Sequence, residues 1–279
     1  MKIHLTNSSP SESVYEVLKL HPQTLLSFAY ANLEHKYVST WIDRPREIIL
    51  DSGAFTAWSA GKQVKVRDYA DWVIGFNQRH GGKLERVRVI NLDRIPGVKG
   101  RTATADEIAA AAIESQQNAD YLYSRGLSPI EVFHQDEPFD LLPELVTRSH
   151  RQQDPRPIIA LSPRNDVSTK ERGKWLDRTL KYCLQTFGKD NLPAAHGLAV
   201  TTPKLCNAYP FYSVDSSTWT QCLRFGVSRI SGLPRLPRTG TAGYHEVYVH
   251  ALKCELVKYQ QLAMDSTKLW KNRGIVWDE

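Results

Sequence analysis

The chain has 279 residues, of which 41% are hydrophobic and 24% are charged, the composition of an ordinary globular protein. No apolar run approaches the roughly 20 residues needed to cross a bilayer, and the N-terminal residues MKIHLTNSSPSES lack the apolar stretch of a signal peptide. These features argue against a membrane protein and predict a cytoplasmic one. Lys and Arg number 36 against 30 Asp and Glu, and this net charge of +6 is compatible with a polyanionic partner.

Short apolar runs rich in Val and Ile alternate along the chain with stretches of helical periodicity. Runs of this kind are typical of strands that are buried on both faces of a parallel sheet. Eight strands are predicted, at residues 25–30, 47–50, 87–92, 130–134, 157–161, 197–200, 211–214 and 227–231.

Helices are predicted between these strands from capping residues and from periodicity. Capping boxes at Thr104 and Ser168 begin two helices, which end at Gly126 and Gly188. Asp68 is predicted to cap another helix, and a last helix is predicted over residues 246–264. The side chains expected to face inward in the last two helices are Leu176, Leu180, Cys183, Leu184, Phe187, Leu252, Leu256 and Tyr259.

Eight strands alternating with helices predict a (β/α)8 barrel, as a single domain over residues 1–279 with its core at about 25–265. A doubly wound open sheet is the structural alternative. No GxGxxG motif follows the first predicted strand, which argues against a dinucleotide-binding half.

Three predicted strands deliver an aspartate to the end of the barrel where catalytic groups lie: Asp51, Asp93 and Asp215. Each one alone would be explained by a cap on the following helix. Together, two carboxylates suit glycosyl transfer, in which one attacks the anomeric carbon and the other handles the proton of the leaving group. A third carboxylate beside the amide of Gln135 suits recognition of a purine.

In this order, DSGAF at 51–55, the Asp of NLD at 93, the Gln of FHQ at 135, HGLAVTTP at 196–203 and FYSVDSSTW at 211–219 resemble the tRNA-guanine transglycosylase superfamily. The resemblance covers residues 25–232 and is closest to the DpdA-type 7-deazaguanine DNA transglycosylases of phages and bacterial DNA-modification clusters. It implies a barrel that exchanges guanine in DNA for a free 7-deazaguanine base such as preQ0 or preQ1. No redox cofactor or ATP is then required.

The resemblance also implies roles for individual residues. Asp215 would be the nucleophile that holds the sugar covalently, and Asp51 would be the general acid and base. Base-binding roles would fall to Ser52, Gly53, Asp93, Gln135, His134 and Gly197.

The chain departs from the tRNA enzymes in lacking their CxCxxC zinc motif, and its four cysteines are spaced irregularly. No metal is therefore expected, and a degenerate zinc site of Cys222, His250 and Cys254, with His245 nearby, is the alternative. The chain also has little room for a separate tRNA-binding domain, which favours DNA as the substrate.

Basic residues of the predicted rim loops would contact DNA phosphates, namely Lys99, Arg101, Arg164, Arg235 and Arg238. A target guanine must be flipped or single-stranded to enter a barrel mouth. The aromatic residues that would stack on it are among Phe55, Trp58, Tyr209, Phe211 and Trp219. Three alternatives remain: a tRNA transglycosylase, a barrel that binds DNA without catalysis, and an unrelated glycoside hydrolase.

Overall fold

The computed structural model describes residues 1–6, 11–39, 47–98, 100–152, 156–220, 225–226, 231–233, 236 and 242–277. Within these residues nine strands form one sheet in the order β5-β4-β3-β2-β1-β9-β8-β7-β6, and every pairing is parallel. The strands are β1 (Lys2–Thr6), β2 (Gln23–Ser27), β3 (Glu47–Asp51), β4 (Arg86–Ile90), β5 (Pro129–Ile130), β6 (Val132–His134), β7 (Ile158–Ser162), β8 (Ala194–Gly197) and β9 (Ser213–Ser216).

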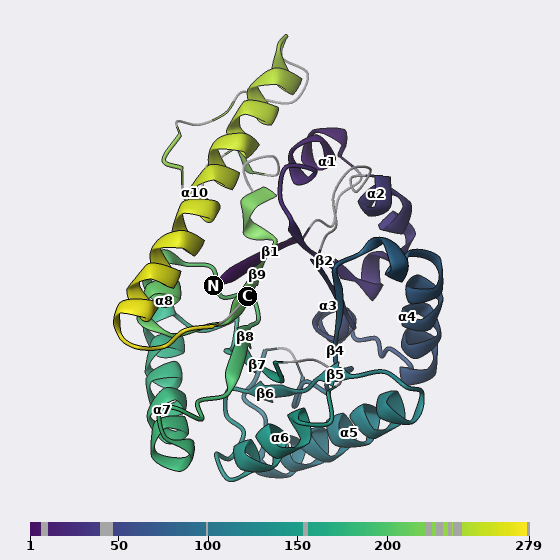
Figure 1. Ribbon diagram of the computed structural model, residues 1–279. Coiled ribbons are helices and arrows are strands. Elements are labelled where there is room, and N and C mark those ends of the chain that lie inside the picture. Colours follow the sequence, from purple (N-terminus) through teal and green to yellow (C-terminus); the bar gives the residue numbers. More distant parts are fainter. Residues whose placement is uncertain are drawn as a thin grey trace.

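The two edge strands of this sheet, β5 and β6, are separated by Glu131 alone. The N–H of Asn91, just after β4, donates to Ile130 O at 2.9 Å, and the N–H of Ala160 in β7 donates to Glu131 O at 2.8 Å. The sheet therefore curls round until its edges meet in one interrupted strand (Figure 1). The predicted α/β barrel is confirmed, with β5 and β6 sharing one of the strand positions.

Helices follow the strands and surround the barrel (Figure 1). The capping boxes predicted at Thr104 and Ser168 are both present, with each side chain bonded to the backbone of the third helical residue. No helix in the described ranges combines the length and the apolar character that crossing a membrane requires. The helices are α1 (Glu12–Leu18), η1 (Phe28–Leu33), α2 (Glu34–Ser39), α3 (Ala54–Ser59), α4 (Val66–His80), η2 (Gly81–Lys83), α5 (Ala105–Ser124), α6 (Leu141–Ser149), α7 (Thr169–Phe187), α8 (Pro203–Ala208), η3 (Thr218–Thr220) and α10 (Tyr244–Asn272).

Alternation along each strand separates two apolar clusters. In β3, Ile48 and Leu50 pack outward with the helices, whereas Ile49 belongs to a smaller cluster that fills the barrel with Leu25 and Ile90. Because successive strand residues point to opposite faces, Asp51 shares the inward direction of Ile49. The same parity turns the strand-end side chains Ser27, His134, Ser162, His196 and Asp215 into the barrel.

The first strand, β1, is absent from the predicted set. Only Ile3 and Leu5 are apolar in Lys2–Thr6, so the segment lacks the continuous apolar run by which the other strands were identified. The barrel consequently begins well before residue 25, and Asp51 ends the third strand rather than the second. The predicted strand at 227–231 falls almost wholly outside the described residues.

Several further boundaries, and the exposure of one side chain, differ from prediction. Strand β2 ends at Ser27 and is followed by η1, and β8 ends where a strand at 197–200 was expected to begin. Helix α4 begins after Lys65, which places Asp68 in its first turn rather than at its cap. In α7, Leu184 is 40% exposed, although it was predicted to face inward. The inward faces predicted for Leu252, Leu256 and Tyr259 of α10 are confirmed.

Candidate active site

Asp51, Asp93 and Asp215 lie at the same end of the barrel. Asp51 is the last residue of β3, Asp93 follows β4, and Asp215 lies in β9. Burial raises the pKa of Asp51, hydrogen bonds from Ser27 and Gly53 lower it, and the charges of Asp93 and Asp215 raise it further, to about 6. The structure therefore brings the three predicted carboxylates into electrostatic contact and gives one of them a pKa near neutrality.

The turn after β3 explains the sequence Asp-Ser-Gly-Ala. Gly53 has φ 72°, and a Cβ atom at this position would lie 2.9 Å from the backbone N of Ala29. A side chain is thus excluded both by conformation and by space. The tight turn lets the N–H of Gly53 donate to Asp51 Oδ2 at 3.0 Å, while Ser52 Oγ accepts from the N–H of Ala54 at 3.3 Å. Gly53 therefore positions Asp51, and Ser52 bonds to the first residue of α3.

Asp215 is held through one of its two oxygens. The N–H of Ala199 donates to Oδ1 at 2.8 Å, and His196 Nε2 lies 3.4 Å from the same atom. Among the described residues, both contacts engage Oδ1, so Oδ2 is the oxygen that remains available to a ligand. Ala199 reaches this position with φ 53°, a left-handed conformation that is unusual for a residue other than glycine.

Fully buried polar groups lie inside the barrel next to Asp215. His196 Nδ1 is 2.8 Å from Ser213 Oγ, and its ring meets that of His4 edge-on, with 5.9 Å between centroids. His4 Nε2 in turn lies 3.7 Å from Glu47 Oε1 at the start of β3. Burial lowers the pKa of His4, so this ring is kept neutral despite the nearby carboxylate. His196 is a contact of Asp215 that the sequence analysis did not assign.

Asp93 is paired with His134, one of the residues to which base binding was assigned. His134 Nε2 lies 2.8 Å from Asp93 Oδ2, and the carboxylate of Glu137 accepts from the backbone N–H of His134 at 2.8 Å. Burial lowers the pKa of His134, but the hydrogen bond and charge of Asp93 and the charge of Glu137 outweigh it, and the pKa is raised overall. His134 therefore orients Asp93 and balances its charge.

Of the predicted base-binding residues Gln135 and Gly197, the first has a donor available to a ligand and the second is explained by packing. Gln135 is half-buried, and its Oε1 accepts from the N–H of Arg164 at 3.1 Å, which leaves the amide NH2 to donate to a ligand. Gly197 is buried, and a Cβ atom there would lie 2.9 Å from Cε1 of Phe211. The small residue at position 197 is thus explained by the packing of Phe211.

The aromatic candidates for base stacking separate by burial. Tyr209, Phe211 and Trp219 are core residues. In contrast, Phe55 is 51% exposed and its ring lies 5.9 Å from that of Trp58. Phe55 therefore has a ring surface open to a ligand, and Trp58 is half-buried.

A cleft of about 330 Å³ adjoins Asp93 on this side of the barrel. Trp58, Leu92, Arg94 and Asn118 also line it. Charged and polar side chains, among them Lys62, Gln63 and Glu114, line it together with apolar ones.

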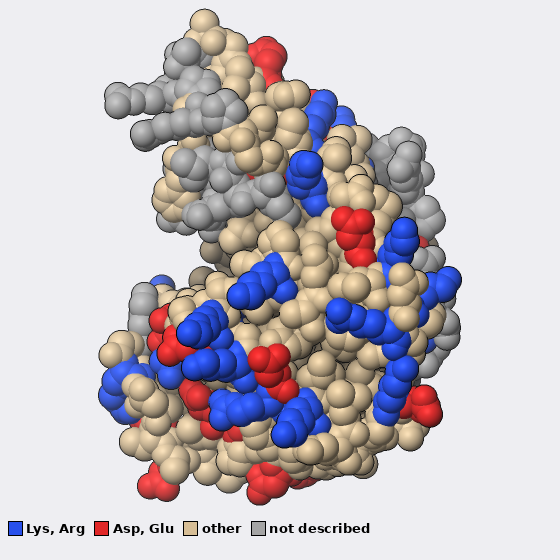
Figure 2. All heavy atoms as spheres, turned by 90° about the vertical axis from the view of Figure 1, so that its left-hand side faces the viewer, with Lys and Arg blue, Asp and Glu red and all other residues tan. Residues whose placement is uncertain are grey.

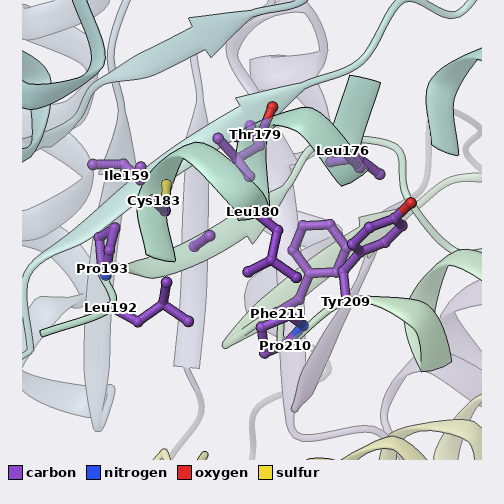
Figure 3. Close-up of a pocket in the computed structure, with 12 residues that line it drawn as sticks. Ile159, Leu176, Thr179, Leu180, Cys183, Leu192, Pro193, Tyr209, Pro210 and Phe211 are labelled. Carbon is purple, nitrogen blue, oxygen red and sulfur yellow. The ribbon is translucent and has the colours of Figure 1, made fainter. Parts of the chain in front are cut away.

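A second cavity, of about 400 Å³, lies between α7 and strands β7 and β8 (Figure 3). Its walls include Ile159, Leu180, Pro193 and Phe211, and none of its lining residues is charged. Burial raises the pKa of the Cys183 thiol in this wall to about 12, so the thiol is not a nucleophile at neutral pH. We interpret the cavity as a packing gap rather than a second active site.

The predicted phosphate-binding residues are largely engaged or outside the described residues. Arg164 pairs with Asp136 (Nη1–Oδ2 3.2 Å) and with Asp166 (Nη2–Oδ2 2.7 Å). Arg101 donates from Nη1 to Glu107 Oε2 at 2.7 Å. Lys99, Arg235 and Arg238 lie outside the described residues.

The sequence analysis missed Arg172, whose Nη2 donates to Ala199 O at 2.8 Å beside Asp215. A signal for it exists, because the first turn of a helix that follows a barrel strand lies at the catalytic end of the barrel.

The alternative zinc site has two of its members in the described region. His250 Nε2 lies 3.6 Å from Cys254 Sγ on α10, and Cys222 is outside the described residues. His245 instead contacts Ser13 Oγ at 3.0 Å and Glu16 at 3.4 Å. In the part of the chain that the structure describes, no three His, Cys, Asp or Glu side chains are grouped to hold a metal ion.

Comparison with known proteins adds no family to this description. No family model matches the chain, and no curated protein matches it either.

Proposed function

We propose that this protein is a DNA guanine transglycosylase that exchanges guanine for a 7-deazaguanine through a covalent Asp215–sugar intermediate. The observation that carries the proposal is the difference between two neighbouring carboxyl groups at the barrel mouth. Asp51 has a pKa raised to about 6, suited to giving and taking a proton, whereas Asp215 is anchored through Oδ1 with Oδ2 available.

The reaction would proceed in two displacements. Asp215 attacks C1′ of the target nucleotide, the bond from C1′ to guanine breaks, and protonated Asp51 gives its proton to the departing base. The incoming 7-deazaguanine then loses a proton to Asp51 and attacks C1′, which releases Asp215 from its ester. The first displacement leaves Asp51 ionised, and the second protonates it again, so the protons balance without a cofactor.

Asp93 and Gln135 would bind the base. An ionised carboxylate accepts from the N1 and N2 edge of guanine, and a primary amide donates to O6. His134 Nε2 lies 2.8 Å from Asp93 Oδ2, and this contact would hold the carboxylate in a fixed orientation for the base. Exposed Phe55 would stack on the flipped guanine.

The charge distribution is compatible with a polynucleotide substrate. Figure 2 shows many Lys and Arg, with Asp and Glu among them, over the lower part of the face on which α7 lies. Along α7, the side chains of Lys170, Lys174, Arg178 and Lys181 are all exposed. Such a surface would attract phosphates irrespective of sequence.

Base exchange is the direct test. The protein is incubated with single-stranded or duplex DNA and either preQ0 or preQ1, the DNA is digested, and the deazaguanine deoxynucleoside is measured by mass. Product is expected with the wild type and not with Asp215→Asn or Asp51→Asn, whereas Asp190→Asn, at an exposed aspartate just after the C-terminal end of α7, should retain it. Product with tRNA but not DNA would replace the substrate in this proposal, and no product with either would contradict it.

A further inference from the structure

Arg172 and Asp215 bind opposite ends of one residue. The guanidinium of Arg172 donates from Nη2 to the carbonyl oxygen of Ala199 at 2.8 Å, and the N–H of Ala199 donates to Asp215 Oδ1 at 2.8 Å. Backbone bond lengths then place Nη2 and Oδ1 within roughly 10 Å of each other. Arg172 is half-buried, so part of its surface remains open to a ligand beside the carboxylate.

The two described arginines that were predicted to bind phosphate are both paired with carboxylates, whereas Arg172, which was not predicted, is not paired with one among the described residues. Arg164 contacts two aspartates and Arg101 contacts a glutamate. Within the described residues, Arg172 forms no ion pair, and its buried Nε has no hydrogen-bond partner. A partly buried cation without an ion-pair partner in contact is costly, so the site favours an anionic ligand. Burial lowers the pKa of Arg172, and the charge of Asp215 only partly offsets this.

We propose that Arg172 binds a phosphate of the DNA strand next to the nucleotide attacked by Asp215. This inference rests on the proposed function, because it places the sugar of that nucleotide at Asp215. The two phosphates of a nucleotide flank its sugar, and a guanidinium presents several donors that match phosphate oxygens. One donor holds Ala199 O, and the donors on Nη1 are available to the ligand. The contact fixes the register of the strand without reading its sequence.

The consequence is a coupling between strand binding and the nucleophile. The side chain that holds the phosphate also holds Ala199, whose N–H fixes Asp215. A bound phosphate would therefore place C1′ relative to a carboxylate that is oriented by the same residue, which is how positioning lowers a barrier.

The test combines Arg172→Met with DNA that lacks one phosphate charge. A labelled single-stranded oligodeoxynucleotide with one guanine is prepared unmodified, with a methylphosphonate on the 5′ or 3′ side of that guanine, or with one several nucleotides away. Binding is measured by fluorescence anisotropy over a KCl series. Arg125→Met is the matched control, because Arg125 ends α5 at the opposite end of the barrel, and Arg172→Lys tests retention of charge.

For Arg172→Met, the slope of log K against log [KCl] should fall by about 0.7, the value for one lost phosphate contact on a single strand. One flanking methylphosphonate should weaken binding by the wild type and by Arg125→Met but not weaken Arg172→Met further, since both changes remove the same contact. Arg172→Lys should recover part of the slope.

Two outcomes would overturn the phosphate site while leaving the transglycosylase proposal intact. One is additive effects of Arg172→Met and every methylphosphonate. The other is a fall in kcat with an unchanged salt slope, which would show that Arg172 only supports Ala199. Absence of base exchange by the wild type would instead contradict the proposed function, whatever the binding data show.

Discussion

The N–H of Ala199 is fixed on Asp215 Oδ1 at 2.8 Å, and Ala199 adopts φ 53° to make this contact. A residue in such a sparsely populated conformation must be held there by its surroundings. Arg172 contributes by donating to the carbonyl oxygen of Ala199. The position of the carboxylate therefore depends on the conformation of a loop residue outside its own strand.

Substitutions of Ala199 test whether the left-handed backbone conformation at this position is needed for stability and for base exchange. Ala199→Gly should keep base exchange and leave the free energy of unfolding within about 1 kcal/mol of the wild type, because glycine accepts positive φ without strain. Ala199→Val should destabilise the protein by about 1–3 kcal/mol and reduce kcat, because a β-branched residue resists this conformation. Urea unfolding and the exchange assay would measure both. Equal behaviour of the two variants would contradict the role given to the backbone here.

Asp51 should make stability fall as the pH rises. Its pKa is about 6 in the folded protein and near 3.9 when unfolded, so between these values the folded state binds more protons and loses stability with increasing pH. Asp51→Asn removes the ionisable group and with it this loss of stability. The free energy of unfolding of Asp51→Asn, relative to the wild type, should increase by about 3 kcal/mol from pH 3.5 to pH 7.5. A pH-independent difference in urea unfolding would show that Asp51 is not perturbed.

His134 should contribute stability mainly at low pH. Its pKa is raised in the folded protein, so its stabilising charge is fully present below the unfolded value near 6.5 and is lost as pH rises through the folded pKa. His134→Phe should cost about 3 kcal/mol at pH 6, because Asp93 would stay buried without its partner, and less at pH 9. Asp93→Asn and the double variant complete a cycle. A coupling energy of zero would be incompatible with the pair.

Gly197 offers a test between packing and base binding. Gly197→Ala should destabilise the protein by about 1–3 kcal/mol, because the new Cβ would meet Phe211 at 2.9 Å. Phe211→Leu in the same chain should recover part of the loss in thermal unfolding. If Gly197→Ala keeps full stability but raises the KM for the free base, the glycine serves the ligand instead.

The apolar runs of the sequence were sufficient to identify most of the barrel. Ile48, Ile49 and Leu50 are buried whichever way they point, so the run itself marks a strand, and its last residue, Asp51, follows by position. Lys2–Thr6 could not be identified in this way, since its inward residue His4 is buried against polar partners, Glu47 and His196, that come from other strands.

The sequence by itself determined that three aspartates would lie at or near the ends of strands of one parallel barrel, because strand length and apolar character are local properties. Only the tertiary structure decided the environment of each carboxylate. The pKa of Asp51 depends on burial and on charges far away in the chain, and the anchoring of Asp215 depends on Ala199 and His196. The tertiary structure also decided which arginine is paired: Arg164 contacts Asp136, whereas Arg172 forms no ion pair among the described residues. Ion pairing is set by distances that only folding creates.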